Sequence, residues 1–238
     1  MMKNRLFLVP AAVLLLASCS ARIDGNLNRD GSAELAIRAS LEPRMAALIR
    51  SLDAASGAGE MVIDGAAIGR SMAAAPGISS VSLHNADPVT VEGTIAVSRI
   101  DQFLMLPESR GGGRLRFIRY EQGAGGGRLV ISLDRDSAPQ LVSLISGEVT
   151  EYLSALMAPA ATGEVLTKAE YLVLVASVYG KAVAGEIAAA RINAVLDFPG
   201  AVSAVRGGSF QGSRVQFEVP LLDLLVLESP LSYEVTWK

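Results

Sequence analysis

Few side chains in this sequence could act as nucleophiles, bases or metal ligands. His84 is the only histidine and Cys19 the only cysteine among 238 residues. Hydrolysis by a serine or cysteine nucleophile needs a base within hydrogen-bond reach, usually a histidine that a third group orients. His84, beside Asn85 and Asp87, could act as that base, but the sequence has no Gly-x-Ser-x-Gly segment to supply the nucleophile. A solvated histidine near a turn is the favoured interpretation.

Glu148 and Glu151, at helical spacing, form the second candidate set. Paired carboxylates can act as acid and base or bind a metal ion. These two fall on the polar side of a predicted amphipathic helix, where a solvated helix face is the favoured interpretation. The glycine-rich segment 123–127 lacks the Lys-Ser/Thr pair and the following helix of a phosphate-binding loop. We therefore expect no catalysis, no metal and no cofactor, with a hydrolase that uses His84 or this carboxylate pair as the alternative.

Residues 1–18 have the three parts of an export signal. Lys3 and Arg5 precede an apolar run from Leu6 to Ala17. A run of about twelve residues is too short to cross a bilayer, which takes roughly 20 residues in a helix. We expect this signal peptide to be absent from the mature protein, and its two cations take the net charge from −3 to about −5. An acidic chain without clustered Lys and Arg argues against binding to nucleic acid.

The segment Leu16-Ala17-Ser18-Cys19 resembles the lipobox of bacterial lipoproteins. The resemblance implies cleavage before Cys19, a diacylglycerol on its sulfur and, in many bacteria, a further acyl chain such as palmitate on the new amino terminus. Two or three acyl chains hold a protein on a membrane, at ~0.8 kcal/mol per buried methylene. An ordinary secretory signal with a chance cysteine is the alternative. With Cys19 as the only cysteine, neither an internal disulfide nor a site built on several thiolates can form.

This resemblance implies a protein of the bacterial cell envelope, lipid-anchored to a membrane. In a cell with two membranes the domain would lie on the periplasmic face, and Ser20 permits transport to the outer membrane by the enterobacterial sorting rule. A strand pattern begins almost directly behind Cys19, which leaves almost no tether. We expect residues 19–238 to form a single domain close to the membrane, with a candidate sub-boundary near 107–113.

Hydrophobic periodicity predicts an α+β fold, with a twisted, largely antiparallel sheet of hairpins packed against two longer amphipathic helices. Alternating apolar residues indicate strands, and apolar residues three and four apart indicate helices. The predicted strands are 21–27, 33–39, 78–84, 89–98, 114–121, 128–134, 191–198, 201–206, 214–219 and 233–237. The predicted short helices are 42–54, 64–74, 98–105 and 221–227, and the two longer helices are 137–157 and 166–190.

The two longer helices carry the candidate binding surface. Their apolar sides could line a ligand cavity, contact a membrane or pack into the core, and they comprise Leu141, Ile145, Val149, Tyr152, Leu156, Leu172, Val175 and Tyr179. The helix 166–190 is interrupted by charges around the ten residues 171–180, so it is too short to span a bilayer. The sequence does not determine the oligomeric state.

Two further segments resemble LppM-type bacterial lipoproteins. One runs from Arg22-Ile23-Asp24 through Asn28-Arg29-Asp30-Gly31-Ser32, and the other is Phe198-Pro199-Gly200-Ala201-Val202, which leads to a Gly-Gly hairpin. The resemblance implies an α+β envelope domain with a twisted sheet and packed helices, without catalytic residues to carry over. Members of that group often have a C-terminal membrane helix, which the sequence up to Lys238 lacks. The amphipathic helices are also similar to those of some spirochaetal lipoproteins thought to engage membranes.

Taken together, these patterns predict a membrane-anchored envelope lipoprotein without enzymatic activity. Its partner would be a hydrophobic ligand, a membrane surface or an envelope protein, among which the sequence does not choose. An envelope hydrolase is the alternative from another functional class.

Overall fold

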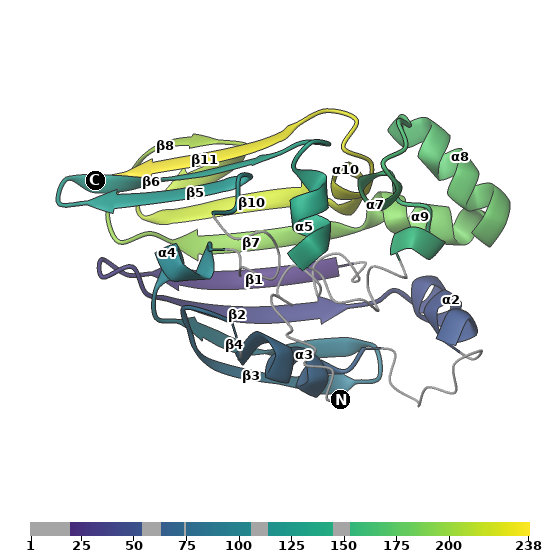
Figure 1. The fold of residues 1–238 in the computed structure, drawn as a ribbon, viewed down its shortest axis with the longest axis horizontal. Helices are drawn as coiled ribbons and strands as arrows, with labels where there is room; N and C mark the ends of the chain where they lie inside the picture. Colours follow the sequence, from purple (N-terminus) through teal and green to yellow (C-terminus); the bar gives the residue numbers. More distant parts are fainter. Residues whose placement is uncertain (1–19, 54–62, 74, 106–113, 145–152) are drawn as a thin grey trace, which may run out of the picture.

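The computed structural model describes residues 20–53, 63–73, 75–105, 114–144 and 153–238, which form two β-sheets and a group of helices (Figure 1). This architecture confirms the predicted α+β class and the largely antiparallel pairing. The seven-stranded sheet contains, in spatial order, β3 (Ile78–Asp87), β4 (Thr90–Val97), β2 (Ala33–Ser40), β1 (Ser20–Leu27), β7 (Arg191–Asp197), β10 (Arg214–Pro220) and β9 (Gly208–Gln211). The four-stranded sheet contains β5 (Ile118–Gly123), β6 (Gly126–Leu133), β11 (Leu231–Trp237) and β8 (Val202–Arg206).

Strand β1 lies in the middle of the larger sheet because it pairs on both sides. It forms the predicted hairpin with β2, and its other neighbour is β7, which runs parallel to it with Ser20 opposite Arg191. Alternation along the sequence indicates that a segment is a strand but not which distant strand it pairs with. The prediction of hairpins therefore did not include this parallel pair.

The larger sheet has one apolar and one polar face, because successive side chains of a strand point to opposite sides. Ile37, Ile95 and Val215 on the apolar face are at most 3% exposed. Part of this face packs against the smaller sheet, where the rings of Phe217 and Tyr233 meet edge to face at 5.5 Å. The opposite face is polar and exposed, and no such packing is seen there among the described residues.

The described helices are α2 (Pro43–Asp53), α3 (Gly65–Ala73), α4 (Ile100–Phe103), α5 (Ala138–Leu144), α7 (Pro159–Thr162), α8 (Lys168–Tyr179), α9 (Lys181–Ala189) and α10 (Leu221–Val226). α3 packs against the apolar side of β3, where Gly69 faces Val81 and Leu83. Helices α2, α8, α9 and α10 gather at the end of the larger sheet where β1 begins (Figure 1).

The prediction of one helix over 166–190 was wrong, because two helices occupy this range. α8 ends and α9 begins at Gly180, whose φ of 90° and ψ of 155° lie outside helical values. A residue with a Cβ is strained at such a φ, so glycine allows the corner. For the other long helix, predicted over 137–157, α5 and the helical residues 153–155 agree with the prediction, and 145–152 lie outside the described residues.

The segment after β8 also differs from the prediction. Gly207, with a φ of 78°, turns the chain from β8 in the smaller sheet to β9 in the larger sheet. The sequence predicted a hairpin at the Gly-Gly pair 207–208 and a next strand at 214–219, but no strand at the position of β9 (Gly208–Gln211). All four residues of β9 are exposed, so this strand has no alternation of buried and exposed positions that a sequence pattern could reveal.

Candidate functional site

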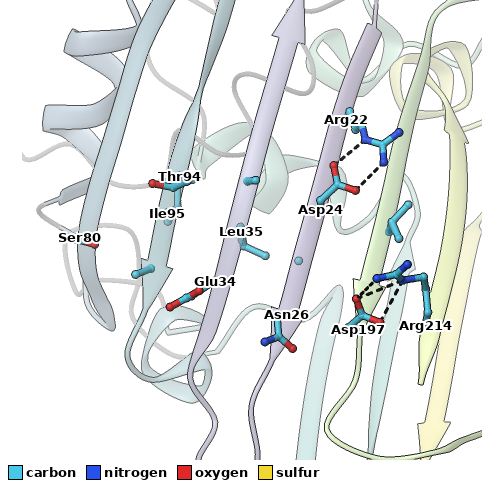
Figure 2. Close-up of a pocket in the computed structure, with 14 residues that line it drawn as sticks. Arg22, Asp24, Asn26, Glu34, Leu35, Ser80, Thr94, Ile95, Asp197 and Arg214 are labelled. Atoms are coloured by element: carbon cyan, nitrogen blue, oxygen red, sulfur yellow. Dashed lines mark hydrogen bonds and ion pairs between the residues drawn. The ribbon is translucent and has the colours of Figure 1, made fainter. Parts of the chain in front are cut away.

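The polar face of the seven-stranded sheet is hollowed into an open trough of about 590 Å³ (Figure 2). The trough crosses six neighbouring strands, from β3 to β10. Side chains from both ends of the chain meet there, because β1 and β7 are adjacent. The labelled lining residues are Arg22, Asp24, Asn26, Glu34, Leu35, Ser80, Thr94, Ile95, Asp197 and Arg214.

Two arginine–carboxylate pairs lie side by side in the trough (Figure 2). Arg22 Nε and Nη2 donate to the two carboxylate oxygens of Asp24 at 2.7 and 2.8 Å, which is a bidentate arrangement. Arg214 Nη2 donates to Asp197 Oδ2 at 2.8 Å. The hydrogen bonds from Arg22 hold the pKa of the Asp24 carboxyl below its usual value, and Arg214 acts in the same direction. Asp24 is therefore charged at neutral pH.

Further pairs continue this arrangement across the sheet. Arg38 of β2 bonds to Glu92 of β4, and Arg191 Nε of β7 lies 3.6 Å from Glu218 Oε1 of β10. The arginine side chains of these four pairs are 36% to 65% exposed. Exposed pairs contribute only ~0–1 kcal/mol to stability, so the fold gains little from them. Their main consequence is a surface on which fixed charges of both signs alternate.

His84 lies on this polar face, on β3. Its side chain is 64% exposed, and Nε2 lies 3.6 Å from Glu92 Oε1, longer than a hydrogen bond. Glu92 also bonds to Arg38, so the carboxylate nearest to His84 is shared with an arginine. The other predicted acid–base pair, Glu148 and Glu151, lies outside the described residues. Hydrolysis therefore stays a hypothesis.

The described members of the predicted apolar surface pack into the hydrophobic core. Val175 is fully buried and Leu156 is 9% exposed. Leu141, Leu172 and Tyr179 are half-buried against the same core. The structure thus brings α8 together with the segment around Leu156. The remaining predicted members lie outside the described residues and are Ile145, Val149 and Tyr152.

Tyr171 is a buried residue of α8 that the sequence prediction did not single out. Its hydroxyl donates to the Leu156 carbonyl oxygen at 3.1 Å, and Tyr179 donates to the neighbouring carbonyl of Ala155. Burial, and to a smaller extent Tyr179, raises the pKa of the Tyr171 phenol. The two tyrosines fasten α8 to the segment before α7, and their spacing of eight residues was the available sign that they share one side of the helix.

Neither a metal site nor a membrane-spanning helix is found in the described ranges. Cys19 lies just outside them, before Ser20. Within 20–53, 63–73, 75–105, 114–144 and 153–238, no three His, Cys, Asp or Glu side chains are grouped so that they could hold a metal ion. No helix in these ranges is both long and apolar enough to cross a bilayer.

Comparison with known proteins gives one weak structural likeness. No family model matches the chain, and no curated protein matches its sequence. The NMR structure of the folded domain of LppM from Mycobacterium tuberculosis is similar over 92% of this chain and 88% of that chain, with a TM-score of 0.40 and 11% sequence identity. These values are too low to transfer a function, so the interpretation of the site rests on its geometry.

Sequence reasoning did not identify the trough as a site. Part of the site could be read from the sequence. Arg22, Asp24 and Asn26 alternate with nonpolar residues along β1, so their side chains share one face of the strand. The proximity of Asp197 and Arg214 depends on the parallel pairing of β1 with β7. That pairing joins segments about 170 residues apart, and no local pattern encodes it.

Proposed function

We propose that this chain is a membrane-anchored, non-enzymatic lipoprotein of the bacterial envelope that binds a protein partner across the polar face of its seven-stranded sheet. The observation that carries the proposal is the exposed series of arginine–carboxylate pairs that runs from β4 to β10. These pairs present donors and acceptors whose positions are fixed before a partner arrives. Preformed groups of this kind give specificity and register at a protein interface.

The mixture of charges favours a protein partner over the other candidates. Anionic lipid and nucleic acid are held by clustered cations, whereas each arginine of this series stands beside a carboxylate. A hydrophobic ligand needs a mostly apolar cavity, and the described members of the predicted apolar surface are occupied with core packing. Arginine is enriched at protein interfaces because its planar group forms several hydrogen bonds at once.

The anchor is the second part of the proposal. The lipobox-like segment ends at Cys19, and β1 begins at Ser20. Because no linker separates the two, acyl chains on Cys19 would confine the sheet to the neighbourhood of the bilayer. A protein held in this way meets its partner at the membrane, where both are concentrated.

Site-specific photo-crosslinking in living cells of the source bacterium tests the binding face. A photoreactive amino acid replaces Thr94, which is exposed in the trough, or Ser132, which is exposed on the smaller sheet. We expect a discrete adduct with one envelope protein from position 94 and none from position 132. The Arg214→Glu variant should abolish the adduct, and Arg214→Glu combined with Asp197→Arg should restore part of it. Equal adducts from both positions, or none from position 94, would contradict the proposal.

The non-enzymatic part has its own test with a serine-reactive fluorophosphonate. We expect the purified lipoprotein to remain unlabelled, because His84 is exposed and the nearest carboxylate is shared with Arg38. Labelling that is present in the natural protein and lost in His84→Ala would support the hydrolase instead.

A further inference from the structure

The pairing registers of the seven-stranded sheet place its polar side chains in rows that cross the strands. Residues opposite one another in neighbouring strands point to the same face of a sheet. One row comprises Glu34, Asn26, Asp197 and Arg214, on β2, β1, β7 and β10, and its side chains lie in a line across the strands in Figure 2. Another row, four residues away along each strand, comprises Arg38, Arg22, Asn193 and Glu218.

Strands β2 and β10 carry opposite charges in these two rows. β2 has an anion at Glu34 and a cation at Arg38. β10 has the reverse order, with a cation at Arg214 and an anion at Glu218. β1 and β7 lie between the two strands, which places β2 and β10 about 14 Å apart. Their complementary charges therefore do not meet within one molecule, but they can meet between two copies.

Several groups in the rows have hydrogen-bonding capacity left for a partner. The exposed side chains of Glu34 and Asn26 form no hydrogen bond or ion pair with another described residue. The Glu218 side chain is 63% exposed, and its distance of 3.6 Å from Arg191 Nε is longer than a hydrogen bond. Arg214 bonds to its own carboxylate partner through Nε and Nη2, which leaves the Nη1 donors available. A second protein can use these groups without breaking the existing pairs.

We infer that the polar face binds a second copy of this chain, related by a twofold axis that runs along the strands between β1 and β7. The inference rests on the proposed function, for which it names the partner. In this arrangement β2 of one copy faces β10 of the other, and β1 faces β7. The facing groups are Glu34 with Arg214, Arg38 with Glu218, Asn26 with Asp197 and Arg22 with Asn193 of the second copy. Each contact brings a donor to an acceptor, and the twofold axis forms each of them twice.

Asp24 selects this axis over the other one that the charges allow. Asp24 lies in the row between the two rows described above. A twofold axis across the strands would also match opposite charges, but it would set the Asp24 carboxylates of the two copies against each other. Like charges that face each other across an interface oppose binding. With the axis along the strands, Asp24 faces Val195 and keeps its bidentate bond to Arg22.

The same axis brings the first residues of β1 in both copies to one end of the dimer. A rotation about an axis along the strands keeps the direction of every strand. Two chains anchored as proposed above can therefore associate on one membrane. An axis across the strands would place their anchors at opposite ends.

The overlap of two copies is large enough for a specific interface. The six strands from β4 to β9 lie over their counterparts, with β4 facing β9. At about 4.8 Å between strands and about 3.3 Å per residue, an area of this width and about seven residues in length covers ~650 Å² on each copy. An interface of standard size buries about 800 Å² per partner. Sheets packed face to face keep their strands within about 30° of each other, so the rows still face each other near the axis.

Native mass spectrometry of the protein purified from the source bacterium, released from detergent micelles, tests the second copy. We expect a dimer of the natural protein and a roughly tenfold smaller dimer fraction for Glu34→Arg and for Arg214→Glu, because each sets like charges against each other. The double variant exchanges the charges of the facing pair and should recover the dimer, which also shows that both substitutions allow folding. The control Arg128→Glu breaks an exposed pair with Glu234 on the smaller sheet and should stay dimeric.

The photoreactive residue at position 94 tests the arrangement of the two copies. Thr94 and Ser209 belong to the row of Asp24, and β4 faces β9. The adduct should therefore contain the tryptic peptide 207–214 of a second copy. Coupling to β4 of a second copy, or a dimer that both charge reversals leave intact, would overturn the arrangement.

Failure of this inference is distinguishable from failure of the proposed function. A monomeric natural protein that couples at position 94 to a different envelope protein would overturn the second copy and leave the binding face in place. The absence of any adduct at position 94 would overturn both.

Discussion

At the residue scale, the burial of Tyr171 predicts a measurable dependence of the free energy of unfolding on pH. The phenol of an unfolded tyrosine has a pKa of about 10, and burial raises the folded value. Above pH 10 the unfolded chain therefore binds fewer protons than the folded one, and the free energy of unfolding falls as the pH rises. Below pH 10 both states keep the proton, and the full stabilisation is present.

The variant Tyr171→Phe should show this dependence by difference. At neutral pH it leaves the Leu156 carbonyl without its hydrogen bond, at a cost of about 1–2 kcal/mol in the free energy of unfolding. Between pH 10 and 12 it should lose less stability than the natural protein, with some loss left because burial also raises the pKa values of Tyr120 and Tyr233. Urea unfolding at several pH values measures both effects. Tyr179→Phe keeps Tyr171 and is the control, and equal alkaline losses in all three proteins would contradict this account.

At the element scale, α8 depends on the way it begins. Thr167 Oγ1 accepts a hydrogen bond from the Glu170 backbone N–H at 3.2 Å, and Glu170 Oε2 accepts one from the Thr167 N–H at 2.8 Å. This capping box satisfies donors that the first turn leaves free. Thr167→Ala should lower the free energy of unfolding by about 1 kcal/mol, read from the midpoint of urea unfolding. Thr167→Ser retains the oxygen and should stay near the natural value. A loss as large in the serine variant would show that the methyl group matters instead.

The elements were predictable from the sequence where burial alternates along them. The hairpin of β1 and β2 and the strand that ends at Trp237 follow from their period of two. The break at Gly180 was not predicted because apolar residues continue on both sides of it. The site was predictable only in part. The alternating sequence of β1 indicates its polar side. The positions of Asp197 and Arg214 beside it depend on the parallel pairing of β1 with β7, which local patterns do not encode.

At the scale of the whole molecule, the larger sheet joins the two ends of the chain. β1 is hydrogen-bonded to β7 over seven residue pairs, and the hydrophobic core includes residues from Ala21 to Trp237. We predict that a fragment of residues 20–106 does not fold alone, because β1 would lose this neighbour and its apolar face would be uncovered. Its amide NMR spectrum should show little dispersion. A dispersed spectrum would instead support an independent unit that ends near the sub-boundary at 107–113.

The attachment of the domain to a membrane through Cys19 also concerns the whole molecule, and it is the central claim. Mass spectrometry of the amino-terminal tryptic peptide tests it most directly. We predict a peptide that begins at Cys19, ends at Arg22 and carries a diacylglycerol on sulfur, and we predict that Cys19→Ser abolishes both the lipid and the recovery of the protein with membranes. A mature chain with a free thiol at Cys19, or one cleaved at a different residue and recovered without fatty acid, would contradict the account.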